Sequence, residues 1–398
     1  MKKLLVAAIT LMIATMSVNA KSTKKVTATP AVEVGAAQVD EYIPLLKGKR
    51  VALLSNNTGM VGSKHTLDIL LENDIKVAMI FSPEHGFRGK ADAGEHVSSS
   101  VDEQTGVRIA SLYDGKGKYP SKENMDQLDI IVVDIQDVGL RYYTYYITMI
   151  NLMEAASMNG KDFMVLDRPN PNGMIVDGPI LDMKYRSGVG RLPIPTVHGM
   201  TLGEIALMAN GEGWLKDGMR VDNLTVIKCK NYTHQTRYQL PIAPSPNLPN
   251  MQSVYLYTTL CYFEGAQCSL GRGTDKPFQI YGNPQMKGKK SYTFTPVSRF
   301  GAKNPPFKDQ QCWGVDLSKE DPEKLIKNGV SFEYVIDAYK NSNMGEKFFT
   351  PFFEKLAGVG YIRTMIMEGK SNAEIKAMWA DDVKKFKEQR RPYLLYEE

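Results

Sequence analysis

Residues 129–137 read Asp-Ile-Ile-Val-Val-Asp-Ile-Gln-Asp, and this stretch decides the fold class. A short run of β-branched residues with polar residues at its ends is typical of a strand buried on both faces of a parallel sheet. Similar apolar runs predict strands at 49–55, 75–81, 107–112, 162–166 and 223–229. Helices are expected between them at 66–72, 121–128 and 144–158, and from Thr201 through Ala209. Alternating strands and helices predict βαβ units and therefore an α/β protein with a mainly parallel sheet.

Four of these strands run directly into loops rich in polar and ionisable side chains. The loops begin at Ser55, Ser82, Gln136 and Asp167. In open α/β sheets, ligands bind beyond the carboxyl ends of the strands, so the pattern predicts a site at this edge. The candidate residues in the loops are Asn56, Glu84, His85, Arg88, Gln136, Asp137, Arg141, Tyr145, Asp167, Arg168 and Asn170.

Glu84 is the candidate for acid catalysis. It lies between Pro83 and His85, with Gly86 and Phe87 close behind. Proline restricts the backbone and glycine allows a ligand to approach it closely. A glutamate near an aromatic ring can have a raised pKa and act as a general acid. The alternative is an exposed loop acid with no chemical role.

The loop after residue 135 suits a sugar. Gln136, Asp137 and Arg141 offer polar groups, and Tyr145 belongs to a cluster of tyrosines that begins at Tyr142. Aromatic rings cover the C–H faces of sugars, while amides and carboxylates bind hydroxyl groups. The alternative is that Arg141 pairs with Asp137 and some tyrosines belong to the core. In the same way, Asp167 and Arg168 either contact a ligand or pair to support their own turn.

A proline-rich stretch divides the chain. Four prolines between 241 and 249 leave no room for regular structure, so we expect a first domain at 33–243 and a second at 244–398. The second should contain helices at 332–340, 347–356 and 373–389. Glu264, Arg272 and Thr274 lie in a glycine-rich stretch whose N–H groups and guanidinium could bind an anion. A turn-rich connection with solvated charges is the alternative.

The N-terminus predicts export. Lys2 and Lys3 precede an apolar run that ends in Val18-Asn19-Ala20, which is the pattern of a signal peptide at 1–20. The apolar run is too short for a membrane anchor. Residues 21–32 should form a disordered lead-in, and the mature protein should be periplasmic, without stable membrane insertion. The net charge of +5, two of which belong to Lys2 and Lys3, is too weak to indicate nucleic-acid binding.

Several cofactor classes lack their motifs. No H-E-x-x-H or C-x2-C pattern predicts a metal site, no G-x-x-x-x-G-K-[ST] a P-loop, and no G-x-G-x-x-G a dinucleotide site. We therefore expect no metal and no cofactor. The four cysteines, Cys229, Cys261, Cys268 and Cys312, allow three disulfide pairings, or they remain as buried thiols.

Taken together, the segments resemble the NamZ-type exo-β-N-acetylmuramidase family, from about Val34 to Tyr396. The segments that carry the resemblance are Ser82-Pro83-Glu84-His85-Gly86, Gln136-Asp137-Val138-Gly139 with Arg141 and Tyr143-Thr144-Tyr145, Leu166-Asp167-Arg168-Pro169-Asn170-Pro171, His198-Gly199-Met200-Thr201, Pro244-Ser245-Pro246-Asn247, and Phe263-Glu264-Gly265 with Gly271-Arg272-Gly273-Thr274.

The resemblance implies a fold and an activity. The family has a Rossmann-like N-terminal domain and a smaller α+β C-terminal domain, with the active site in the cleft between them. Its members release N-acetylmuramic acid from the non-reducing end of peptidoglycan fragments, and they use the Glu of the P-E-H-G motif, Glu84 here, as the catalytic residue. His198 and Asn247 enter as substrate-binding candidates through the family segments that contain them.

The sequence offers several candidates for the second catalytic group and for the group that binds the substrate carboxylate. Glycosidases need a second group opposite the acid. Asp137, Asp92, Glu95, Glu264 or the substrate's own acetamido oxygen could serve. Muramic acid carries a lactyl carboxylate, which one of three arginines, Arg141, Arg168 or Arg272, could bind.

A different function fits the same layout. An exported protein with two α/β domains around a cleft could be a non-catalytic periplasmic receptor for muropeptides or sugars. An esterase is less consistent with the sequence because it has no G-x-S-x-G motif. The oligomeric state cannot be deduced from the sequence.

Overall fold

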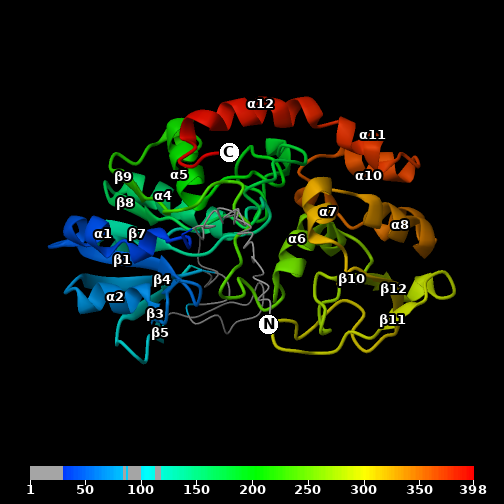
Figure 1. Ribbon diagram of the computed structural model, residues 1–398, viewed down its shortest axis with the longest axis horizontal. Helices are drawn as coiled ribbons and strands as arrows, with labels where there is room; N and C mark the ends of the chain where they lie inside the picture. The colour runs from blue at the N-terminus through cyan, green and yellow to red at the C-terminus, as the bar shows by residue number, and fades with distance from the viewer. Residues whose placement is uncertain (1–29, 84–86, 88–99, 113–117) are drawn as a thin grey trace, which may run out of the picture. The chain divides into compact units, whose positions relative to one another are not determined.

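A seven-stranded sheet in the order β5-β6-β4-β1-β7-β8-β9 forms the frame of the first half of the chain (Figure 1). The computed structural model describes residues 30–83, 87, 100–112 and 118–398. The strands are β1 (Arg50–Ser55), β4 (Lys76–Ser82), β5 (Ser100–Val101), β6 (Arg108–Ser111), β7 (Ile130–Asp134), β8 (Asp162–Leu166) and β9 (Leu224–Ile227). A small hairpin, β2 (Met60–Val61) with β3 (Lys64–His65), lies outside this sheet.

Parallel pairing brings the strand ends together. Neighbours from β6 to β9 pair in parallel, and only the edge strand β5 is antiparallel. In the centre, Leu53 of β1 pairs with Val132 of β7, and Ser55 pairs with Asp134. The predicted mainly parallel α/β sheet is therefore confirmed, and the loops that follow β1, β4, β7 and β8 leave from one edge.

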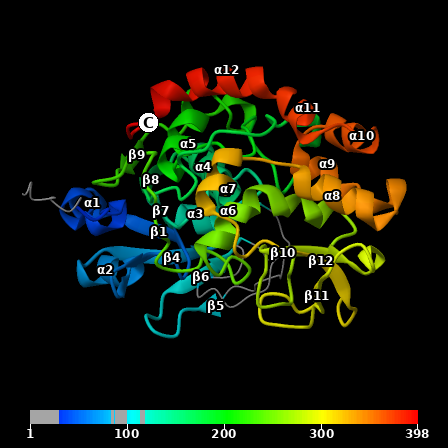
Figure 2. The ribbon, with the colours of Figure 1, turned by 45° about the vertical axis from the view of Figure 1, so that its right-hand side comes forward.

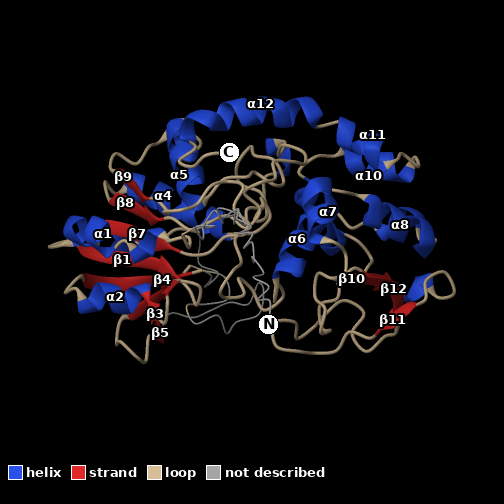
Figure 3. Ribbon diagram, in the orientation of Figure 1, coloured by secondary structure: helices blue, strands red, loops and turns tan. Residues whose placement is uncertain are grey.

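Helices cover both faces of the sheet (Figure 3). On one face, α1 (Val39–Leu46) and α2 (Thr66–Glu72) pack against alternate strand residues such as Leu53 and Val132. On the other, α3 (Lys122–Asp126), α4 (Tyr145–Met158) and α5 (Leu202–Gly211) pack against the intervening residues. Burial on both faces explains why the strands are continuously apolar.

The second half is smaller and mixed. A three-stranded antiparallel sheet, in the order β10-β12-β11, contains β10 (Ile280–Asn283), β11 (Tyr292–Phe294) and β12 (Cys312–Asp316). This half also contains α6 (Met251–Leu260), α7 (Pro322–Asn328), α8 (Glu333–Ser342), α9 (Phe352–Ala357), α10 (Tyr361–Met367) and α11 (Asn372–Ala377). The last long helix, α12 (Ala380–Arg390), runs from α11 back towards α5 (Figure 2). This agrees with the expected smaller α+β part.

Short 3-10 helices join these elements. They are η1 (Gly35–Ala37), η2 (Met183–Tyr185), η3 (Lys216–Gly218), η4 (Cys261–Gly265), η5 (Pro284–Met286), η6 (Gly345–Phe348) and η7 (Arg391–Tyr393). After α12 the chain returns to the first half, where Tyr393 of η7 contacts Gly211 at the end of α5 (Figure 1).

Two predicted helices are broken. The segment 347–356 splits into η6 and α9 because Phe349 is extended (φ −96°, ψ 144°) and Pro351 starts the next helix. The segment 373–389 splits into α11 and α12 at Trp379, whose ψ of 1° is not helical. Trp379 is buried and its indole donates to Asp177 Oδ1 at 2.7 Å, so a tertiary contact fixes the break.

One continuous apolar cluster joins the two halves. It runs from strand residues such as Leu54 through α4 and α6 to Phe386 of α12. Residues Val32–Glu398 accordingly form one compact unit. The division at 243/244 remains a proposal about domains.

The four cysteines are buried free thiols, which is the second of the two alternatives left open by the sequence. Within the described ranges, no helix is long and apolar enough to cross a membrane.

Candidate active site

The predicted edge of the sheet holds a cavity of about 210 Å³. It lies where α4 begins, beside the loop that follows Pro244 and the glycine-rich stretch around Arg272. Its lining residues are Tyr142, Tyr143, Thr144, Tyr145, Val189, Ser245, Asn247, Leu248, Tyr257, Glu264, Arg272 and Phe278. The cavity thus brings together four residues predicted from sequence, namely Tyr145, Asn247, Glu264 and Arg272.

Tyrosines form one wall of the cavity. Tyr143 and Tyr145 pack edge to face with ring centroids 4.8 Å apart, and the hydroxyl of Tyr143 donates to the carbonyl of Pro244 at 2.7 Å. The hydroxyl of Tyr145 accepts a hydrogen bond from Asn56 Nδ2 at 2.9 Å. Asn56 therefore acts on the cavity through Tyr145, and the wall is held rigid by its own contacts.

A charged pair also lines the cavity. The guanidinium of Arg272 donates to Glu264 Oε1 at 3.0 and 2.5 Å and stacks over Phe278, 5.0 Å from the ring centroid. Both side chains are partly accessible, at 21% and 26% of their surface. A rigid, partly accessible arginine beside an aromatic wall can bind a carboxylate without a large loss of side-chain entropy.

Glu84, the candidate for acid catalysis, lies outside the described residues. The same holds for His85 and Arg88, and for Asp92 and Glu95, two candidates for the second catalytic group. Phe87, three residues beyond Glu84, is described. It is buried and packs edge to face on His65, with 5.0 Å between the ring centroids. Phe87 therefore lies next to His65 of β3.

Two predicted arginines have internal partners. Arg141 has no exposed surface, and its guanidinium donates to the backbone carbonyls of Pro179, Ile194, Leu356 and Ala357. Arg168 is buried and donates to Asp134 Oδ1 and Oδ2 at 2.5 and 3.0 Å. This geometry argues against both as carboxylate-binding groups and leaves Arg272. The alternative in which Arg141 pairs with Asp137 is not found among these contacts.

Asp137 is buried beneath the candidate site. The N–H of Gly139, which has a φ of +78°, donates to its Oδ1 at 2.7 Å, while Oδ2 has no hydrogen-bond partner. Burial raises the pKa of the Asp137 carboxyl to about 7, against the opposing effect of the backbone hydrogen bonds. Asp137 does not line the cavity, so its place among the catalytic candidates loses support.

Asp167 ties three segments together beneath the site. Its carboxylate accepts from Thr201 Oγ1 at 2.7 Å, Gly203 N at 2.9 Å and Tyr396 Oη at 2.6 Å. Burial raises its pKa to about 6, and these hydrogen bonds oppose that shift. Its position indicates a structural role.

The other predicted residues also contact protein groups. Gln136 Nε2 donates to the carbonyl of Pro169 at 2.7 Å, and Asn170 Nδ2 donates to the carbonyl of Met200 at 2.9 Å. Thr274 Oγ1 donates to the carbonyl of Gly271 at 2.7 Å. His198 is buried, which lowers its pKa to about 3. None of the four lines the cavity.

Sequence reasoning missed Tyr257 and Phe278. Tyr257 belongs to α6, which was not predicted, and Phe278 has a left-handed backbone (φ 54°) that no local pattern indicates. The tyrosines from Tyr142 to Tyr146 were the sequence feature that indicated an aromatic wall here, because successive aromatic residues after a strand are unusual for a simple connection.

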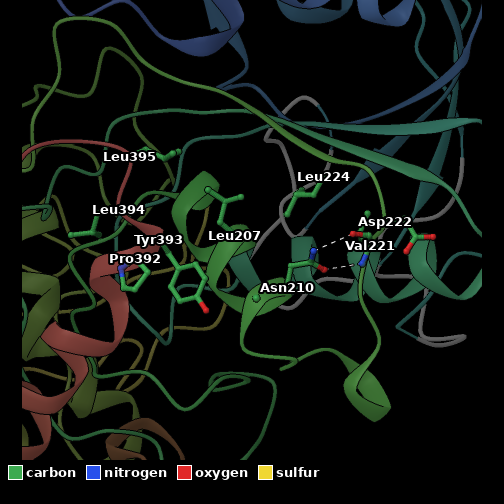
Figure 4. Close-up of a pocket in the computed structure, with 10 residues that line it drawn as sticks. Leu207, Asn210, Val221, Asp222, Leu224, Pro392, Tyr393, Leu394 and Leu395 are labelled. Atoms are coloured by element: carbon green, nitrogen blue, oxygen red, sulfur yellow. Dashed lines mark hydrogen bonds between the residues drawn. The ribbon is translucent and has the colours of Figure 1, made fainter.

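A second, larger cavity of about 320 Å³ has a different character (Figure 4). It lies between α5, the start of β9 and the C-terminal segment, and Asn210 is hydrogen-bonded to the backbone of Val221 beside it. Its lining is mostly apolar, and Asp222 and Leu224 place it at the amino end of β9. Ligand sites of open α/β sheets form at the opposite edge, which favours the smaller cavity.

No group of three or more His, Cys, Asp or Glu side chains capable of holding a metal ion occurs in the described part of the chain.

Comparisons with known proteins cover nearly the whole chain. Residues 51–252 match the family described as "Exo-beta-N-acetylmuramidase NamZ, N-terminal", and residues 255–396 match its C-terminal counterpart. The chain is 42% identical over 389 residues to the peptidoglycan beta-N-acetylmuramidase NamZ of Bacillus subtilis, with 92% of each chain covered.

Solved structures agree with this assignment. A DUF1343 family protein from Bacteroides fragilis has a TM-score of 0.87 and 58% identity, and the match covers 93% of this chain and 100% of that one. A second DUF1343 protein from the same organism has a TM-score of 0.76 at 29% identity, over 92% and 100% of the two chains. Two family matches in succession and a relative aligned along almost its whole length establish that the chain belongs to the exo-β-N-acetylmuramidase NamZ family.

Proposed function

We propose that this protein is a glycosidase that releases N-acetylmuramic acid from the non-reducing end of peptidoglycan fragments such as MurNAc-GlcNAc, in cell-wall turnover. The observation that carries the proposal is the alignment with the Bacillus subtilis peptidoglycan β-N-acetylmuramidase, at 42% identity over 92% of both chains. At that coverage, the alignment spans both halves of the chain.

The cavity has the chemistry that such a substrate requires. The rings of Tyr143 and Tyr145 offer apolar surface for the sugar face, and Asn247 and Ser245 offer polar groups for hydroxyls. Arg272 is the described arginine that lines the cavity, so we assign it to the lactyl carboxylate. Glu264 holds the guanidinium in place.

Glu84 supplies the proton for the leaving oxygen. Two candidates for the opposite side of the sugar are the Glu264 carboxylate, which lines the cavity, and the substrate's own acetamido oxygen. Asp92 and Glu95 stay candidates from outside the described residues. The Glu264 carboxylate is favoured if it lies near the anomeric carbon of the bound sugar. Attack by the acetamido oxygen requires no protein carboxylate near that carbon. Removing Glu264 separates them, because substrate-assisted hydrolysis should survive in Glu264→Gln with a higher KM.

Export follows from the N-terminal sequence. The apolar run from Leu4 to Met16 and the small residues before Lys21 have the pattern of a cleavable signal peptide. A periplasmic enzyme would meet peptidoglycan fragments directly, which agrees with the proposed substrate. We retain the division at 243/244 as the proposed domain boundary.

The test is to incubate the protein with MurNAc-GlcNAc and to follow the release of free N-acetylmuramic acid. Chitobiose, which lacks the lactyl group, is the matched control substrate. Release from MurNAc-GlcNAc at a much higher rate supports the proposal. Tight binding without turnover would instead support the alternative, a periplasmic sugar receptor.

A further inference from the structure

A second polar cavity, of about 300 Å³, lies beside α4. Its lining residues are Lys118, Tyr119, Arg186, Arg191, Trp214, Leu215, Lys216 and Asp217. They come from three segments of the chain, at 118–119, 186–191 and 214–217, and four of the eight carry a positive charge. We call this cavity the basic pocket.

A buried carboxylate organises the basic pocket from behind. Glu154 of α4 is fully buried and accepts hydrogen bonds from Tyr119 Oη at 2.6 Å, Arg191 at 2.6 Å and the backbone N–H of Lys216 at 2.9 Å. These bonds fix the three segments to α4 before any ligand arrives. Such preorganisation reduces the entropic cost of binding.

Glu154 neutralises only one of the four cations. Its close partner is Arg191, whereas Lys118 Nζ lies 3.9 Å from it. Lys216 Nζ lies 3.9 Å from the carboxylate of Asp217, a side chain that is 71% exposed. Arg186 forms no ion pair with any carboxylate in the described ranges. Among the described residues, four cations therefore face two carboxylates, Glu154 and Asp217, and the basic pocket keeps an excess of positive charge.

The direction of the Lys118 pKa shift agrees with this excess of positive charge. Burial, followed by repulsion from Arg191, Arg186 and Lys216, lowers the pKa of Lys118, and Glu154 offsets this only in part. An anion placed among these cations would relieve their mutual repulsion. Trp214 adds an aromatic surface at the same place, which suits a ring attached to the anion.

We propose that the basic pocket is a binding site for a small ring-bearing oxyanion, such as a sugar carrying a phosphate or carboxylate group. Arg186, Lys118 and Lys216 bind the oxyanion, and Trp214 contacts the ring. Arg186 presents the planar fork that matches two oxygens of a phosphate or carboxylate. The site is separate from the candidate active site, since the two cavities share no lining residue.

The test is to titrate the full chain with glucose 6-phosphate, glucuronate and glucose by isothermal calorimetry. NaCl keeps the ionic strength constant. We expect one site for an anionic sugar and no binding of glucose. Comparing glucose 6-phosphate with glucuronate shows whether phosphate or carboxylate is the preferred group.

Variants locate the site. Arg186→Ala combined with Lys216→Ala should raise the Kd of the anionic sugar at least about tenfold, the loss expected for two charge-assisted contacts. Both side chains belong to exposed residues, so the fold should be retained. Lys184→Ala is the matched control, because Lys184 is 66% exposed, lies two residues from Arg186 and does not line the pocket. Lys118→Ala provides an independent variant from another segment.

Three results would overturn the proposal. They are the absence of saturable binding of either anion, unchanged affinity in the double variant and in Lys118→Ala, or an equal loss in Lys184→Ala. Because the readout is binding of sugars that are not glycosides, it is independent of whether the enzyme hydrolyses MurNAc-GlcNAc.

Discussion

At the scale of single residues, charged side chains with similar sequence settings differ in whether they already have partners inside the protein. Arg141, Arg168 and Arg272 were equivalent candidates in the sequence. The structure gives the first to backbone carbonyls and the second to Asp134, and it leaves the third beside a cavity. Loop motifs point to one edge of the sheet, but they do not say which side chain faces a ligand, because that depends on contacts between distant segments.

Arg272 gives a first prediction at this scale. Arg272→Ala should raise KM for MurNAc-GlcNAc by about ten- to a hundredfold, the range expected on losing a charge-assisted hydrogen bond of about 1.5–3 kcal/mol. The measurement is steady-state kinetics. Arg299→Ala is the control, since Arg299 is 44% exposed and pairs with the exposed Asp275. An unchanged KM in Arg272→Ala would show that the lactyl carboxylate is bound elsewhere.

Asp137 gives a prediction about pH. Burial raises its pKa from an ordinary value of 3.8 to about 7, so the folded state holds the proton through a pH range in which the unfolded chain has lost it. The free energy of unfolding should therefore fall as pH rises from about 4 to 7, by up to about 4 kcal/mol from this group.

Asp137→Asn should remove that slope, because an amide cannot ionise. The measurement is urea denaturation of both proteins at several pH values. The difference between the two curves should change steadily in favour of the variant as pH rises. A constant difference across the range would mean that Asp137 has the same pKa in the folded and unfolded states, and it would contradict the raised pKa.

At the scale of elements, local signals located helix starts well. Thr201 and Ser371 both form the predicted capping boxes, with Glu204 and Glu374 bonded back to the backbone. The helix ends in the second half were predicted less well. Trp379 breaks one predicted helix through its bond to Asp177, which is distant in sequence. Interactions of this kind leave no periodic pattern, so they are not visible in the sequence.

The two capping boxes should differ in energy. Ser371→Ala should cost about 0.5–1 kcal/mol, as for an exposed cap. Thr201→Ala should cost about 2–3 kcal/mol, because it also removes the 2.7 Å bond to the buried carboxylate of Asp167. Thermal or urea unfolding of both variants checks this. Equal losses would show that the Thr201–Asp167 bond adds nothing to the cap.

At the scale of the whole molecule, a few buried polar groups join the two halves. Arg141 contacts carbonyls at 179 and 194 in the first half and at 356 and 357 in the second. Gly358, with a φ of +76°, lies so close to the guanidinium that a Cβ would stand 2.5 Å from Nη2. The sheet class and its order of strands and helices could be predicted from local patterns. The junction could not be predicted in this way, because Arg141 and its partners in the second half, Leu356 and Ala357, are more than 200 positions apart in the sequence.

Arg141→Lys tests the junction. Lysine has three donors on one nitrogen and cannot reach four carbonyls that are arranged around a planar fork. We expect a loss of about 3–5 kcal/mol in the free energy of unfolding, as for other broken buried charge networks. The measurement is urea denaturation, with the surface variant Arg108→Lys as the control. Wild-type stability in Arg141→Lys would contradict the role of Arg141 as a junction.

The central claim is that Glu84 donates the proton that cleaves the glycosidic bond. The most direct measurement is turnover of MurNAc-GlcNAc by Glu84→Gln, with substrate affinity measured on the same protein. Glu103→Gln, an exposed residue of the β5–β6 turn, is the matched control. The account predicts that kcat falls at least about a hundredfold in Glu84→Gln while affinity changes little, and that Glu103→Gln remains fully active. Full turnover by Glu84→Gln would contradict it.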